Sequence, residues 1–140
     1  MLTLSADLRR TENYYMKNNE LTILEHMHDY CLRVEESIAR FGNSQETFLA
    51  DFDFRNSVSM SIFQIGELAN HLSEQYRDST RHKISWQQVK GMRNLFAHDY
   101  LKMDELKIWN TARLDVPLLQ TFCDAEIKRL KTKADREHDR

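Results

Sequence analysis

Residues 19–43, NELTILEHMHDYCLRVEESIARFGN, decide the fold class of this chain. Apolar side chains recur there at alternating spacings of three and four residues, at Leu24, Met27, Cys31, Val34, Ile38 and Phe41. Because an α-helix turns by about 100° per residue, this alternation places all of them on one face. The stretch therefore predicts a long amphipathic helix, which we expect to end at Gly42 and Asn43.

The same alternation continues in two later stretches. One predicts a second long helix, with apolar positions at Val58, Ile62, Ile65, Ala69, Leu72 and Tyr76. The other predicts a C-terminal helix, with its stripe at Leu106, Trp109, Arg113, Val116, Leu119, Cys123, Ile127 and Leu130. Asp104 is its expected N-cap. Pro117 removes a backbone hydrogen bond inside this helix, so we expect a bend near residues 113–117 rather than two separate helices.

Short signals fill the gaps between these stretches. Ser44 is suited to cap a short helical turn that carries Phe48. Ser85 and Gln88 form a capping-box pattern, S-x-x-Q, which predicts the start of a third helix that contains Val89, Met92 and Phe96. The expected fold is all-α: an antiparallel bundle of four main helices plus one short extra helix, with a proline-bent C-terminal helix.

Composition supports a helical, single-domain protein. The 140 residues include only three glycines and one proline, so strand-and-turn architectures lack their usual turn residues. Residues 1–18 are polar and aperiodic, and we expect a flexible N-terminal extension there. The predicted helical-bundle domain covers residues 19–131, and residues 132–140 form a charged C-terminal tail.

Charge and hydrophobicity narrow the function classes. The formal net charge of −2 excludes the overall basicity that drives non-specific nucleic-acid binding, so any contact with RNA must be local. No stretch has the roughly 18 apolar residues of a membrane span, and the N-terminus lacks a signal-peptide core. Cys31 and Cys123 lie at apolar helical positions, where a free cysteine acts as a small hydrophobe. We therefore expect a cytoplasmic protein without membrane contact.

The segment Arg93 to Tyr100, RNLFAHDY, is the candidate functional centre. It combines a guanidinium (Arg93), a carboxamide (Asn94), an imidazole (His98), a carboxylate (Asp99) and a phenol (Tyr100). Histidine exchanges protons near neutral pH, and arginine offers a fork of donors that matches phosphate oxygens. Together they suit cleavage of an RNA phosphodiester without a metal or another cofactor.

Helical geometry makes one copy of this segment look incomplete. Asn94 and His98 lie on one face, whereas Arg93 and His98 diverge by about 140° on an ideal helix. One histidine cannot conveniently act as both acid and base on opposite sides of the phosphorus. A two-fold homodimer that brings two copies together would supply the second set, so we expect the dimer to be the active unit.

The octet has the form R-N-x-x-A-H-x-Y and resembles the R-x4-H-x-Y motif of HepT-like HEPN ribonuclease toxins. Ile65-Gly66-Glu67 resembles the I-G-E element of the second long helix in that family. The C-terminal helix pattern of the family is matched by Trp109, Asp115, Pro117 and Leu118. The resemblance covers roughly Asn19 to Leu130 and implies a HEPN-like bundle.

The resemblance also implies a function. The resemblance implies that the protein is the toxin of a type VII toxin–antitoxin system. Such a toxin is an endoribonuclease that acts as a homodimer and is encoded beside a minimal nucleotidyltransferase antitoxin. Carried over by position, Arg93 and His98 are catalytic, while Asn94 and Asp99 support them. Tyr100 is the tyrosine to which the antitoxin transfers AMP. An adenylyl group there would place bulk and negative charge where an RNA phosphate must bind.

Glu67 is a further candidate that follows from the pattern of the second helix. It lies beside the apolar stripe and next to Gly66, which allows another helix to approach closely. We expect Glu67 to pair with Arg93 and orient it.

Two other interpretations are weighed against this one. His26 and His28 point about 200° apart on a helix and cannot easily share a metal ion, so we expect surface side chains there. The alternative function is a non-catalytic HEPN module that dimerises and binds a partner protein or a nucleotide. The intact octet favours the ribonuclease, because a scaffold has no need for these side chains together.

Overall fold

The structure is a computed structural model that describes residues 2–97 and 104–138. These residues form helices without any strand, so the predicted all-α class is confirmed. In chain order the elements are α1 (Leu2–Phe41), α2 (Gln45–Ala50), α3 (Phe52–His71), α4 (Glu74–Thr80), α5 (Trp86–Gly91), α6 (Asn94–Ala97), α7 (Glu105–Asn110), the π-helical turn η1 (Thr111–Asp115) and α8 (Val116–His138).

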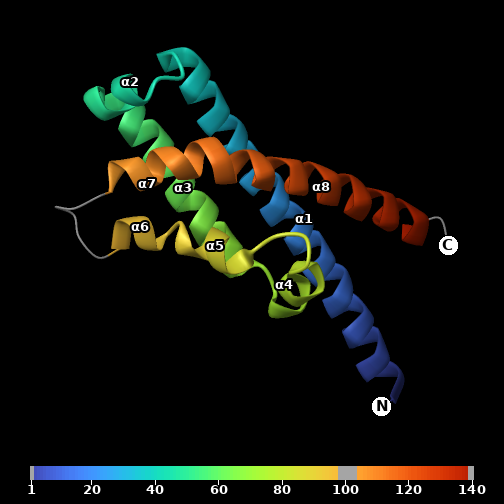
Figure 1. The fold of residues 1–140 in the computed structure, drawn as a ribbon. Coiled ribbons are helices and arrows are strands. Elements are labelled where there is room, and N and C mark those ends of the chain that lie inside the picture. The colour runs from blue at the N-terminus through green and yellow to red at the C-terminus, as the bar shows by residue number, and fades with distance from the viewer. Residues whose placement is uncertain (1, 98–103, 139–140) are drawn as a thin grey trace.

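The bundle is built around α1, which packs against α3 on one side and α8 on another. The chain reverses direction between α1 and α3, and α5 and α6 lie below α7 in Figure 1. Leu24, Met27 and Cys31 of the predicted stripe of α1 are fully buried. Phe48, Phe54 and Trp109 pack ring against ring, so the short helix α2 closes one end of the core.

The first helix begins earlier than the sequence pattern predicted. We expected it to start near Asn19, whereas α1 runs from Leu2. Residues 2–18 contain no glycine or proline, so nothing in their sequence interrupts a helix once it has formed. The last helix likewise extends past the core residue Leu130 to His138. Hydrophobic periodicity marks where a helix is buried, not where it ends; the domain boundaries at residues 18 and 131 stay predictions.

The second long helix is shorter than predicted. It was expected to continue through Tyr76, but α3 ends at His71, and Ser73 caps the separate helix α4 through a bond from the Tyr76 N–H. The Ser73 hydroxyl also donates to the carboxylate of Glu20 on α1. Arg77 Nη1 donates to the carbonyl of Ala69 at 3.1 Å, which satisfies the end of α3. These three interactions fix the break.

The predicted caps are present. Gly42 and Asn43 end α1 with φ angles of 100° and 49°, the left-handed region that closes a helix. Ser44 accepts a bond from the Thr47 N–H at 3.3 Å, and Ser85 accepts one from the Gln88 N–H at 3.3 Å. Asp104 accepts from the Lys107 N–H at 3.2 Å and starts α7.

Pro117 produces a π-helical turn. The Val116 N–H donates to the carbonyl of Thr111, five residues back rather than four. A wider turn at residues 111–115 relieves the contact between the proline ring and the preceding turn, while α7, η1 and α8 remain one helical run (Figure 1). The irregularity that we expected at residues 113–117 is therefore this turn.

No helix in the described ranges is long and apolar enough to cross a bilayer.

The two cysteines, Cys31 and Cys123, are buried free thiols, and burial raises the pKa of Cys31 to about 12. Both behave as core residues, as the sequence predicted.

Candidate functional site

The motif begins where α5 ends. The sequence predicted one helix from Ser85 past Phe96, whereas α5 stops at Gly91 and α6 starts at Asn94. The Met92 and Arg93 N–H groups donate to carbonyls only three residues back, Val89 and Lys90, at 3.2 and 3.3 Å. This tighter turn departs from the ideal helix for which the divergence of about 140° between Arg93 and His98 was calculated. His98, Asp99 and Tyr100 lie outside the described residues.

Gly66 brings α3 into contact with the backbone of Arg93. A Cβ atom at Gly66 would lie 2.6 Å from the Arg93 amide nitrogen and 3.1 Å from the Arg93 Cβ. Neither atom belongs to a flexible side-chain end, so any larger residue would push the two segments apart. The prediction that Gly66 permits close helix approach is confirmed, and the segment that approaches is the motif itself.

Glu67 and Arg93 form the ion pair that the sequence predicted. Arg93 Nε lies 2.6 Å from Glu67 Oε1, and the two side chains are 52% and 31% exposed. An ion pair this exposed contributes little to folding free energy, because water screens both charges. Its effect is geometric: a carboxylate on α3 fixes the direction of a guanidinium on another segment while leaving it accessible.

A pocket of about 430 Å³ opens beside this pair, and we call it the Lys90 pocket. Its described lining contains three cationic side chains and three carboxamides, and no carboxylate: Arg77, Lys90 and Arg93 with Asn70, Gln87 and Asn94. Trp86 and Gly91 complete the lining. Sequence reasoning found Arg93 and Asn94 but missed Lys90. A partial signal was present, because Gln87 and Lys90 are three residues apart within α5 and share a face of that helix.

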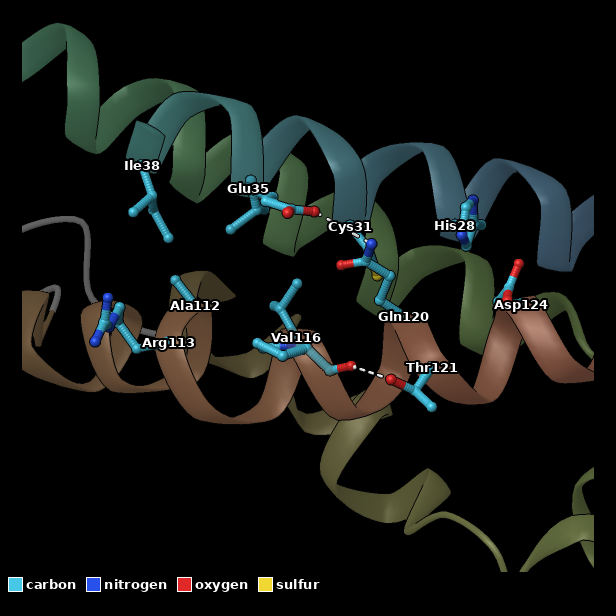
Figure 2. A pocket seen from close by; sticks show the side chains of 12 residues that line it. His28, Cys31, Glu35, Ile38, Ala112, Arg113, Val116, Gln120, Thr121 and Asp124 are labelled. Atoms are coloured by element: carbon cyan, nitrogen blue, oxygen red, sulfur yellow. Dashed lines mark hydrogen bonds between the residues drawn. The ribbon is translucent and has the colours of Figure 1, made fainter. Parts of the chain in front are cut away.

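A groove beside α8 differs from the Lys90 pocket in its lining charges. It measures about 610 Å³ and lies between α1 and the η1–α8 run (Figure 2). His28 and Arg113 line it together with the carboxylates Glu35 and Asp124, and Gln120 donates to Glu35 at 3.2 Å across it. Figure 2 shows Cys31 and Val116 among the residues that line this groove. None of the described lining residues belongs to the octet. Within the described ranges, no three His, Cys, Asp or Glu side chains gather to hold a metal ion.

A buried polar network joins α4 to α8 and connects to Trp86, a lining residue of the Lys90 pocket. Glu126 on α8 is 2% exposed, and it accepts bonds from Tyr76 Oη at 2.8 Å and from Arg129 Nε at 2.7 Å. The bonds from Arg129 hold the pKa of the Glu126 carboxyl below its usual range despite burial. Burial and this carboxylate raise the pKa of Tyr76. The network ties α4 to α8.

The same network reaches the pocket wall. Trp86 Nε1 donates to Thr80 Oγ1 at 2.8 Å, and that hydroxyl donates to the Tyr76 carbonyl at 2.8 Å. Each of these buried side chains is satisfied, so we assign the network a structural role in holding Trp86 and α5 in place. Sequence reasoning missed Glu126, although its spacing from Cys123 and Leu130 places it on the buried face.

The sequence of this chain matches a protein family and several known proteins. A family model described as "Ribonuclease HepT-like" matches residues 23–126. A protein named "Putative RNase" from Caldanaerobacter subterraneus subsp. tengcongensis is 29% identical over 97 residues, 69% of this chain and 84% of its own length. Another of that name, from Methanocaldococcus jannaschii, is 27% identical over 88 residues, 63% of this chain and 75% of its own length.

The comparison with solved structures gave no match. The family match nevertheless covers most of the chain, including Gly66, Glu67 and the whole octet. The chain therefore belongs to the HepT-like ribonuclease family of HEPN proteins.

Proposed function

We propose that this protein is an endoribonuclease toxin that cleaves RNA without a metal, using Arg93 and His98. The observation that carries the proposal is the Glu67–Arg93 pair, which presents a half-exposed guanidinium at the edge of a pocket whose described lining holds no carboxylate. A scaffold protein gains almost nothing in stability from such a pair. A phosphate-binding enzyme gains a pre-positioned donor fork.

The proposed reaction is a transesterification. The 2′-oxygen of the RNA attacks the adjacent phosphorus as its proton leaves, the bond from phosphorus to the 5′-oxygen breaks, and that 5′-oxygen takes up a proton. His98 supplies the proton transfer on one side, since imidazole titrates near neutral pH. Arg93 neutralises the charge that builds on the phosphoryl oxygens. We assign supporting contacts to Asn94 and Asp99.

We further propose that the active unit is a homodimer, in which a second octet supplies the partner acid or base. The exposed apolar side chains of Leu114 and Leu118, 65% and 71% accessible, support the presence of a protein-binding surface on the η1–α8 run. They lie one helical turn apart, so they form one patch.

The proposed regulation acts through Tyr100. A cognate minimal nucleotidyltransferase antitoxin of a type VII toxin–antitoxin system would transfer AMP to this phenol, and the added phosphate would compete with RNA for the cations of the site. Incubation with the antitoxin and ATP should add adenylyl units to the intact mass of the wild type, and Tyr100→Phe should stay unmodified. Equal modification of the two proteins would overturn the assignment of Tyr100.

The experiment that tests the enzymatic function is expression of wild type, Arg93→Ala and His98→Ala, followed by incubation of each purified protein with cellular RNA. We expect growth arrest and RNA cleavage from the wild type alone. If all three proteins are equally harmless and none cuts RNA, the enzymatic proposal is wrong, and the non-catalytic binding module becomes the better account.

A further inference from the structure

We propose that the Lys90 pocket binds the sugar-phosphate backbone of the RNA strand beside the cleaved bond, and that Lys90 contacts a flanking phosphate there. The inference deepens the proposed ribonuclease function and rests on it. It adds a substrate subsite that extends beyond the octet and a positioning residue, Lys90, that acts by holding RNA rather than by touching the reacting atoms.

The sign of the lining charges distinguishes this pocket from two other pockets in the described part of the chain. In the groove between α1 and α8, His28 and Arg113 face Glu35 and Asp124. In a third pocket, between α1 and α3, Arg33 and Arg40 are offset by Glu36 and Asp53. The Lys90 pocket has no such acidic partners in its described lining. On a chain of net charge −2, this local excess of positive charge favours binding of a polyanion here.

The three cations of the pocket are not equally available. Arg93 is paired with Glu67, and Arg77 is bonded to the carbonyls of Ala69 and Leu72 at the end of α3. Among the described residues, no carboxylate lies within ion-pairing distance of the Lys90 ammonium. Lys90 therefore carries the charge that a ligand can recruit without first breaking a contact inside the protein.

The remaining described lining offers hydrogen-bond donors for the sugar-phosphate backbone and no aromatic face for stacking a base. Asn70, Gln87 and Asn94 are exposed carboxamides, which donate to phosphate and sugar oxygens. The one aromatic side chain in the described lining is Trp86, which is 5% exposed and whose N–H is bonded to Thr80. It therefore forms part of the pocket wall and offers no ring face on which an RNA base could stack. We therefore expect little base preference at this subsite.

The position of Lys90 sets the path of the strand. Lys90 lies three residues before Arg93, and the Arg93 N–H donates to its carbonyl. Both side chains line the same pocket, so a strand that contacts the Lys90 ammonium reaches the Arg93 guanidinium without leaving it. The volume of about 430 Å³ lies within the range of pockets that hold small ligands, and one nucleotide is of that size.

Binding of a non-cleavable probe tests the inference independently of catalysis. The probe is a fluorescent single-stranded oligonucleotide with 2′-O-methyl groups, which has no 2′-hydroxyl to attack the phosphorus. We would measure its affinity across a series of salt concentrations for wild type, Lys90→Gln, Lys90→Arg and the control Lys133→Gln. Lys133 is an exposed lysine near the end of α8, away from the pocket lining.

We expect Lys90→Gln to bind about tenfold more weakly at low salt, as expected for loss of a hydrogen bond to a charged group. The slope of log affinity against log salt should become shallower by about 0.7, the value for one phosphate contact on a single strand. Lys90→Arg and Lys133→Gln should match the wild type, and probes of different base sequence should respond alike to Lys90→Gln.

Equal affinities and slopes for Lys90→Gln and Lys133→Gln would overturn the inference. So would a Lys90→Gln effect confined to binding of the antitoxin protein, since this would make the pocket a protein contact. If the probe binds as expected but unmodified RNA is not cut by the wild type, the ribonuclease proposal fails while the assignment of the RNA subsite stands.

Discussion

The contact between Gly66 and Arg93 shows how much of the site is decided by single residues. With no Cβ, Gly66 lets the Arg93 backbone approach to a distance that any other residue would prevent. Glu67, the next residue, then reaches Arg93 Nε at 2.6 Å. This part of the site was predictable, because a glycine next to an acidic residue on a long helix marks a close approach with a charged partner. Lys90 and Glu126 were not recognised, because their roles depend on which elements pack around them.

Glu67→Gln tests the orienting role of the carboxylate. The amide keeps the size of the side chain and loses its charge, so Arg93 is no longer held in one direction. We expect RNA cleavage to fall by about tenfold or more, while the free energy of unfolding changes by less than about 1 kcal/mol because the pair is exposed. Cleavage assays together with urea unfolding measure both quantities. Cleavage at the wild-type rate would refute the orienting role.

Gly66→Ala tests the close approach. The added methyl group would meet the Arg93 amide nitrogen at 2.6 Å, so α3 and the motif segment must separate. We expect a loss of about 1–3 kcal/mol in unfolding free energy, typical of overpacking, together with reduced cleavage. Gly91→Ala is the matched control for stability, since a Cβ there meets nothing within 4 Å. Equal losses of unfolding free energy in the two variants would contradict this account.

At the scale of elements, apolar periodicity found the helices but not all of their breaks. Leu72 and Tyr76 continue the stripe of α3, and both are buried, so the pattern gives no sign that the chain leaves the helix between them. A serine at position 73 could lie inside a helix or cap a new one. Ser73 caps α4 because its hydroxyl donates to Glu20, which is distant in sequence, and because Arg77 satisfies the Ala69 carbonyl at the end of α3. Local signals such as Ser44, Ser85 and Asp104 were sufficient where the capping partner is close in sequence.

The link between α4 and α8 should make stability depend on pH. Because the pKa of Glu126 is lowered in the folded protein, its contribution to stability is present above the unfolded pKa of about 4.3 and is lost as the pH falls through the lower folded value. We expect the melting temperature to fall on acidification through that range, and to fall less steeply in Glu126→Gln. Parallel acid profiles for the two proteins would contradict the assignment.

Tyr76→Phe tests the same link from α4. The substitution removes the donor 2.8 Å from Glu126 Oε1 and leaves a buried carboxylate with one bond fewer. We expect a loss of about 1.5–3 kcal/mol in unfolding free energy, the contribution of a hydrogen bond to a charged group, while Arg129 keeps both carboxylate oxygens bonded. Tyr30→Phe, on the half-buried face of α1, is the control. A Tyr76→Phe protein as stable as the control would show that the bond contributes nothing.

At the scale of the whole molecule, the fold brings together Arg77, Lys90 and Arg93, the cations that we propose to bind phosphate, in the lining of the Lys90 pocket. Charge patterning along the sequence did not reveal this concentration, since a net charge of −2 averages over all faces. Folding separates the charges: carboxylates offset the basic residues in two pockets and are missing from the described lining of the third. The resulting local field is consistent with an RNA substrate on an acidic protein.

The most direct measurement of the central claim is the rate at which purified protein cuts a short RNA in the presence of a metal chelator. We expect wild type to cleave, to leave a 2′,3′-cyclic phosphate, and to stop cutting a bond whose attacking 2′-hydroxyl is replaced by hydrogen. Arg93→Ala should be slower by about 100-fold or more, the usual loss when a donor to the transition-state oxygens is removed. Cleavage by Arg93→Ala at the wild-type rate, or equal cutting of the 2′-deoxy bond, would contradict the account.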